Sequence, residues 1–129
     1  MQQKKILIVD DAPSIREILA TQLGRLHYET FTAADGEEAV ELFKKSKPDL
    51  VLMDMMMPRV DGLAATQKIR AFEKKGKRTP ILFLTARDGQ YDKLSSAISG
   101  GDAFVSKPIS LQDLQLHVEK ALRRSKKRR

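Results

Sequence analysis

The sequence predicts an α/β protein in which a parallel sheet of five strands is covered by helices on both faces. Short and almost wholly apolar runs alternate along the chain with longer stretches of helical periodicity. A strand that is buried on both faces has no polar side, so continuous apolar runs are typical of a parallel sheet. The regular alternation of strands and helices favours the same doubly wound architecture.

Five segments are expected to form the strands: residues 5–10, 28–33, 50–54, 80–85 and 103–106. The first, third and fourth are apolar along most of their length, which indicates central strands. The second alternates and is rich in Thr, Tyr and Phe, which indicates a strand nearer the edge of the sheet.

Five helices are expected to connect and follow these strands: residues 12–25, a helix opened by Asp35-Gly36 and ended by Pro48, residues 63–75, residues 88–99, and a last helix capped by Ser110. Ser14 precedes Glu17 by three residues, which is the spacing of a capping box at the first helix. In the third helix Ile69 and Phe72 are expected to face inward.

The composition is typical of one globular domain. The chain has 129 residues, of which 41% are hydrophobic and 32% are charged. No apolar run approaches the ~20 residues that cross a bilayer, and the N-terminus has no signal-peptide pattern. We therefore expect a cytoplasmic protein without a membrane contact.

The net charge of +7 is concentrated at the C-terminus, where residues 123–129 read RRSKKRR. We expect residues 1–122 to form the domain, with Leu122 as the last inward residue, and residues 123–129 to form a frayed basic tail. A solvated tail is the more common explanation of such a run. Weak, salt-sensitive binding of the tail to nucleic acid is the alternative.

Polar residues follow four of the predicted strands. Asp10 and Asp11 end the first strand, Asp54 ends the third, Thr85 and Ala86 end the fourth, and Lys107 follows the fifth. The functional crevice of an open α/β sheet lies outside the carboxyl ends of its strands, so we expect these groups to converge. Each of these residues, considered by itself, also has an ordinary structural explanation; an Asp pair, for example, often caps a helix.

Three clustered carboxylates repel one another, and a hard divalent cation such as Mg²⁺ relieves that repulsion. A carboxylate beside Mg²⁺ can also attack phosphorus and form an aspartyl-phosphate. A lysine ammonium and a threonine hydroxyl suit the phosphoryl oxygens. The set therefore indicates phosphoryl transfer.

A resemblance to a known family covers the chain to about Arg124. Four motifs carry it: VDD at 9–11, DMMMPRVDG at 54–62, LTAR at 84–87 and GGDAFVSKP at 100–108. In these the chain resembles the receiver domain of two-component response regulators. The resemblance implies a flavodoxin-like fold with strand order 2-1-3-4-5.

The resemblance also implies a role for each site residue. Asp54 would be the phosphoacceptor. Asp10, Asp11, Asp54 and the Met56 carbonyl would hold Mg²⁺, with Asp10 acting partly through a metal-bound water. Thr85, the Ala86 N–H and Lys107 would bind the phosphoryl oxygens.

A conformational switch is implied as well. Thr85 would move toward the phosphoryl group, and Phe104 would fill the space left behind, so that the face of the fourth helix, fifth strand and fifth helix changes. Packing alone is the alternative role for Phe104. The implied partners are a histidine kinase or phosphotransfer protein and a downstream effector or output domain. A phosphorylation-linked homodimer is left open.

Two departures from the family pattern limit this inference. The last helix carries Gln115, Leu116 and His117 where receivers of winged-helix transcription factors usually have an Arg for a dimer contact. The chain also ends soon after this helix, and the sequence leaves open whether it is a stand-alone regulator or an excised receiver.

Two enzymatic or carrier functions compete with a signalling switch. A phosphatase that uses an aspartyl-phosphate would need an acid two residues after the nucleophile, where Met56 stands. A flavin carrier would need a phosphate-binding loop rich in Ser, Thr and Gly after the first strand, where Asp10 and Asp11 would instead repel a phosphate unless a metal intervened. We therefore expect no enzymatic activity beyond self-directed phosphoryl transfer and autodephosphorylation.

Overall fold

The computed structural model describes residues 3–54, 62–73, 78–85, 103–106 and 110–127. Its strands are β1 (Lys5–Val9), β2 (Glu29–Ala33), β3 (Leu50–Asp54), β4 (Ile81–Thr85) and β5 (Ala103–Ser106). They form one sheet in the order β2-β1-β3-β4-β5, and every neighbouring pair is parallel. This is the order that the family resemblance implies.

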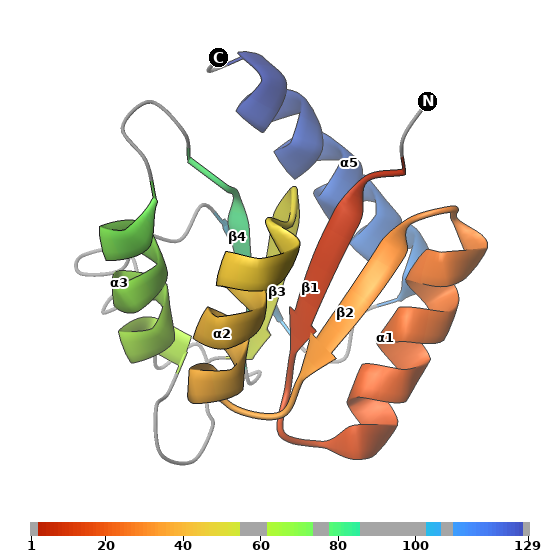
Figure 1. The fold of residues 1–129 in the computed structure, drawn as a ribbon. Helices are drawn as coiled ribbons and strands as arrows, with labels where there is room; N and C mark the ends of the chain where they lie inside the picture. The colour runs from red at the N-terminus through yellow and green to blue at the C-terminus, as the bar shows by residue number, and fades with distance from the viewer. Residues whose placement is uncertain (1–2, 55–61, 74–77, 86–102, 107–109, 128–129) are drawn as a thin grey trace.

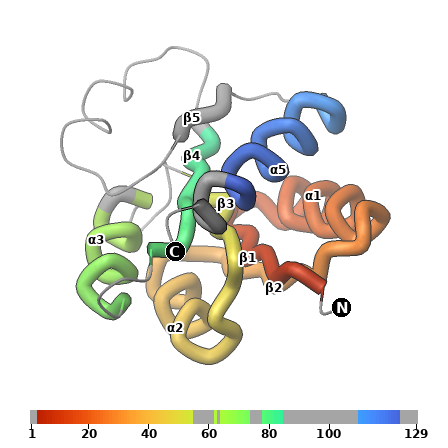
Figure 2. The backbone as a smooth tube through the Cα atoms, turned by 90° about the horizontal axis from the view of Figure 1, so that it is seen from above, coloured from red at the N-terminus to blue at the C-terminus, as the bar shows by residue number. Residues whose placement is uncertain are grey.

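The described helices are α1 (Pro13–Arg25), α2 (Gly36–Ser46), α3 (Gly62–Phe72) and α5 (Leu111–Lys127). Helices α2 and α3 cover one face of the sheet, while α1 and α5 cover the other (Figures 1 and 2). The helix expected over residues 88–99 lies outside the described residues. No helix in the described ranges is long and apolar enough to span a membrane.

The core consists of two apolar layers, one on each face of the sheet, because successive strand residues point to opposite faces. Every side chain of the three central strands in these layers is at most 2% exposed. The layer against α2 and α3 contains Leu7, Val9, Val51, Met53, Ile81 and Phe83. The layer against α1 and α5 contains Ile6, Ile8, Leu50, Leu52, Leu82 and Leu84.

The start of α1 differs from the capping box that the sequence suggested. Ala12 is the N-cap residue and no side chain caps the helix, so Ser14 does not have the expected role. The first helical residue is Pro13, whose ring fixes a φ angle close to that of a helix. The Asp10 carboxylate accepts a hydrogen bond of 3.0 Å from the Ala12 N–H.

The starts of α2 and α5 agree with the sequence. Asp35 caps α2, because its carboxylate accepts a 2.8 Å hydrogen bond from the Glu38 N–H. The Ser110 hydroxyl caps α5 by accepting a 3.1 Å bond from the Asp113 N–H. Helix α2 ends before Pro48, because Lys47 already adopts a left-handed conformation with φ of 50°.

Two expectations about helix surfaces and ends were wrong. Ile69 is buried as expected, but Phe72 is 52% exposed because α3 ends there, at the rim of the helix layer. The Lys44 ammonium covers part of its ring, 4.9 Å from the centroid. Helix α5 continues to Lys127, so residues 123–127 are helical, where fraying was expected from residue 123; residues 128–129 lie outside the described ranges. Cations near a helix C-terminus interact favourably with the helix dipole, which supports this extension.

The cap at Asp35 and the absence of a cap at Ser14 allow a direct test of the two helix starts. Asp35→Ala should lower the free energy of unfolding by about 1 kcal/mol, because the Glu38 N–H loses its acceptor. Ser14→Ala should change it by less than about 0.5 kcal/mol, since this exposed residue caps nothing. Urea unfolding followed by circular dichroism measures both. An equal loss in the two variants would contradict the described start of α1.

Candidate metal centre at the carboxyl edge of the sheet

Three carboxylates meet at the carboxyl edge of the central strands. One oxygen from each of Asp10, Asp11 and Asp54 lies within 4.8 Å of the others. These are the three acids that the sequence placed at the ends of its first and third strands. The expected convergence of the acidic residues is therefore confirmed.

The strand register brings Asp10 and Asp54 together. Val9 pairs with Met53, so Asp10 follows β1 level with Asp54, the last residue of β3. Asp54 pairs on its other side with Leu84 of β4. Both residues are buried: Asp10 is 1% exposed and Asp54 is 5% exposed.

Asp10 is also anchored through its own backbone. Its N–H donates a 3.1 Å hydrogen bond to the carbonyl of Ala33, which extends the β1–β2 pairing by one residue. Its side chain accepts from the Ala12 N–H and so closes the turn into α1. Asp11, in contrast, is exposed, so the acidic cluster has one solvent-accessible side.

The arrangement is costly without a counter-charge. At an effective dielectric constant near 20, two unit charges 4 to 5 Å apart repel by on the order of 3 kcal/mol. Asp10 and Asp54 are both buried, so water screens this pair poorly. A divalent cation is the simplest compensation.

The donor set fits Mg²⁺. All three side chains offer carboxylate oxygens, which are the ligands that hard cations prefer, and the exposed side leaves room for water ligands. No histidine or cysteine belongs to the cluster, so the described residues do not favour a softer metal. Neither histidine belongs to the cluster, since His27 precedes β2 and His117 lies within α5.

The remaining predicted site residues are described in part. Thr85 is the last residue of β4, beside Ser106 of β5, so its backbone lies at the same edge of the sheet as the acids. Phe104 lies in β5 beside Phe83. Met56, Ala86 and Lys107 lie outside the described residues.

One residue at this edge was not identified from the sequence. The Arg16 guanidinium, from the first turns of α1, donates a 2.7 Å hydrogen bond to the backbone carbonyl of Asp10. A basic residue early in a helix that follows two acids was the available signal. It was missed because the interaction is with a backbone atom, which the sequence pattern does not reveal.

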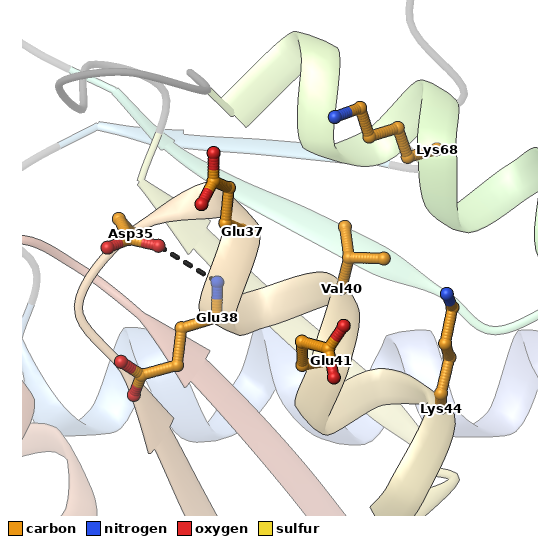
Figure 3. A pocket seen from close by; sticks show the side chains of 7 residues that line it. All are labelled: Asp35, Glu37, Glu38, Val40, Glu41, Lys44 and Lys68. Atoms are coloured by element: carbon orange, nitrogen blue, oxygen red, sulfur yellow. Dashed lines mark hydrogen bonds between the residues drawn. The ribbon is translucent and has the colours of Figure 1, made fainter.

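A pocket also lies between α2 and α3, but its lining does not indicate a reaction site. Its volume is about 550 Å³, and its lining includes four acids, two lysines and Val40. Figure 3 shows the acids on α2 and its cap, with Lys68 facing them from α3. Asp35, Glu37 and Glu38 stand at the N-terminus of α2, where the helix dipole favours negative charge. Helix stability therefore accounts for these three acids.

Comparison with known proteins identifies the family. The model of the family described as response regulator receiver domain matches residues 6–119. This chain belongs to the response regulator receiver family. It is thus a receiver domain of a two-component system, and receiver domains of this family bind Mg²⁺ in their acidic site.

Curated relatives of this receiver are transcriptional regulators by name. It is 41% identical to "Probable transcriptional regulator ycf27" of Porphyridium aerugineum over 96% of its own length and 50% of the relative's. It is 40% identical to "Alkaline phosphatase synthesis transcriptional regulatory protein PhoP" of Bacillus subtilis over 95% and 50%, respectively. The receiver spans about half the length of these relatives.

Solved structures share the fold. The receiver domain of sensor histidine kinase PA1611 from Pseudomonas aeruginosa, described with magnesium in its active site cleft, aligns with a TM-score of 0.84 and 32% identity. That alignment covers 94% of this chain and 98% of the other. Chemotaxis protein CheY4 of Vibrio cholerae aligns with a TM-score of 0.81 and 30% identity, covering 93% and 99%.

Mg²⁺ should stabilise the receiver, because the ion relieves the repulsion among the three acids. At ten times its dissociation constant, Mg²⁺ should raise the free energy of unfolding by about 1.4 kcal/mol. The gain should shrink in Asp11→Asn and persist in Glu41→Gln, which removes an exposed acid from α2. Thermal unfolding with and without Mg²⁺ at constant ionic strength measures it. An unchanged melting temperature in the wild type at millimolar Mg²⁺ would refute this metal site.

Proposed function

We propose that this receiver is a phosphorylation-dependent switch that accepts a phosphoryl group on Asp54 in a Mg²⁺-dependent reaction. The observation that carries the proposal is the position of Asp54, which ends a buried strand and brings a carboxylate oxygen within 4.8 Å of those from Asp10 and Asp11. A nucleophilic carboxylate needs both a fixed position and nearby charge neutralisation.

The chemistry assigns different roles to the three acids. An Asp54 oxygen attacks phosphorus and forms the acyl-phosphate bond, while the bond from phosphorus to the donor's imidazole nitrogen breaks and the electron pair stays on that nitrogen. Asp10 and Asp11, together with Asp54 itself, would hold the cation, since all three offer carboxylate oxygens within 4.8 Å of one another. When bound, Mg²⁺ neutralises charge on the phosphoryl oxygens.

The family resemblance supplies the remaining roles. The Thr85 hydroxyl and the Ala86 N–H would donate to phosphoryl oxygens, Lys107 would pair with their charge, and the Met56 carbonyl would complete the metal ligands. The position of Thr85 at the end of β4 supports its role, since this strand is the neighbour of β3.

The switch would link this edge to a distant surface. Thr85 and Phe104 lie on neighbouring strands, two residues apart in register, since Phe83 is the partner of Phe104. Inward movement of Thr85 would favour a second packing of Phe104 and so alter the surface of residues 88–99, β5 and α5. That surface would control the output by a shift between two populated states.

A histidine kinase or phosphotransfer protein is the proposed donor, and an effector or output domain is the proposed recipient of the signal. We place the exchange in the cytoplasm, where a kinase has access to ATP. The names of the curated relatives make transcription the first output to test. We propose no enzymatic activity beyond phosphoryl acceptance and autodephosphorylation; a homodimer formed on phosphorylation is an additional outcome to measure.

Incubation with Mg²⁺ and a small acyl- or amido-phosphate donor should add one phosphoryl group to the protein, measured as intact mass. Asp54→Asn should abolish the gain, because an amide is a far poorer nucleophile than a carboxylate. Asp49→Asn is a matched control at the opposite end of β3, where the side chain accepts from the Lys5 N–H, and it should be phosphorylated normally. Full phosphorylation of Asp54→Asn would exclude Asp54 as the acceptor.

A further inference from the structure

Arg16 connects α1 to the acidic edge through a backbone atom. Its Nη1 donates a 2.7 Å hydrogen bond to the carbonyl oxygen of Asp10, and the side chain is half-buried. The interaction is charge-assisted, and bonds of this kind are roughly twice as strong as those between neutral groups. The guanidinium therefore does more than cover the surface of α1.

The bond completes a three-point attachment of Asp10. The N–H of Asp10 is held by the Ala33 carbonyl of the strand, its carboxylate by the Ala12 N–H and its carbonyl by Arg16. The first of these attachments comes from the sheet and the other two from the start of α1. Every polar group of Asp10 thus has a partner that resists its rotation.

Fixing the Asp10 carbonyl also fixes the backbone nitrogen and Cα of Asp11. This carbonyl belongs to the peptide plane that joins the two acids, and a peptide plane is rigid. The orientation of this plane determines the direction that the backbone takes at Asp11 after β1 ends. Asp11 is exposed, and this peptide is its connection to the buried part of the cluster.

Mutual repulsion would otherwise separate the three acids. Asp54 is held by the sheet register and Asp10 by its hydrogen bond to the Ala33 carbonyl, whereas Asp11 lies one residue further from the end of β1. An attachment that aligns the Asp10–Asp11 peptide before a cation arrives reduces the ordering that binding requires.

We propose that Arg16 is a positioning residue for the cation site, holding the Asp10–Asp11 peptide so that both carboxylates stay directed toward Asp54. This inference rests on the proposed Mg²⁺ site. Residues outside the ligand set that orient the ligands typically contribute 10- to 100-fold to metal affinity. Arg16 would act in this way through the main chain.

The direction in which the Mg²⁺ affinity changes when Arg16 is replaced distinguishes a positioning role from a purely electrostatic one. If the guanidinium acted as a charge alone, its removal would make the site more negative and Mg²⁺ binding tighter. If it positions the acids, its removal weakens Mg²⁺ binding. A purely structural anchor of α1 would change the stability of the fold and leave the Mg²⁺ affinity unchanged.

Arg16→Gln is the test, with Mg²⁺ affinity measured by calorimetry and by amide chemical shifts of Asp10 and Asp11 in titrations with Mg²⁺ alone. We expect the dissociation constant to rise about tenfold. Arg16→Lys retains a donor and a charge, so it should recover part of the affinity. Its measurement also keeps the test decisive should Arg16→Gln fold poorly.

Arg70→Gln is the matched control. Arg70 also donates from Nη1 to a backbone carbonyl at 2.7 Å, that of Thr79, but it connects the end of α3 to the segment before β4. This variant should lose stability and keep the Mg²⁺ affinity of the wild type. Melting in the absence of Mg²⁺ measures the structural cost of each change.

The outcomes distinguish this inference from the proposed function. Mg²⁺ affinity of Arg16→Gln within twofold of the wild type, or tighter, would overturn the positioning role while leaving the metal site intact. An equal loss of affinity in Arg70→Gln would overturn it too, since the effect would then follow from general destabilisation. Absence of Mg²⁺ binding by the wild type at millimolar concentration would refute both the proposed site and the role of Arg16.

Discussion

The parallel pairing of β1 with β3 is the constraint on which the site depends. It fixes Val9 beside Met53 and so brings the acids after one strand level with the acid that ends the other. The pairing is stable because its side chains are buried on both faces between two helix layers. A one-residue slip would turn every side chain of a strand to the opposite face. The apolar core and the acidic cluster therefore share one geometric cause.

The cluster opposes the stability that the core provides. Carboxylates so close together repel one another, and hydrogen-bond donors and a cation reduce that repulsion. The structure supplies hydrogen bonds to Asp10 from the turn into α1, and the exposed Asp11 leaves one side open to solvent. A site that is destabilising alone and relieved by a ligand is suited to respond to that ligand, because binding then stabilises the folded state.

The family match identifies the type of domain, and the geometry of the acids identifies a candidate site within it. The family match spans nearly the whole chain, while the curated relatives are about twice as long. The shared fold therefore does not identify the output, because one fold can serve many different functions. In this chain the exposed apolar residues of α5 are Leu111 and Leu116, at 39% and 61% exposure, and α5 belongs to the surface through which we propose that the signal leaves.

The sequence by itself determined the type and order of the described strands and helices, because apolar runs and helical periodicity reflect local burial. It also placed the acids at strand ends, since each follows a continuous apolar run. The family motifs, which are local as well, supplied the strand order. Cap geometry was less predictable. Asp35 and Ser110 cap their helices, but Ser14 does not. At α1 the Asp10 carboxylate accepts from the Ala12 N–H, and Pro13 is the first helical residue.

Only the tertiary structure decided what depends on distant contacts. The exposure of Phe72 follows from where α3 ends relative to the layer beneath it, which helical periodicity alone does not report. The 4.8 Å convergence of the three carboxylates requires the β1–β3 register, formed by residues more than forty positions apart. The bond from Arg16 to the Asp10 carbonyl spans only six residues, but it depends on how α1 packs beside β1, and a backbone acceptor has no signature in the sequence.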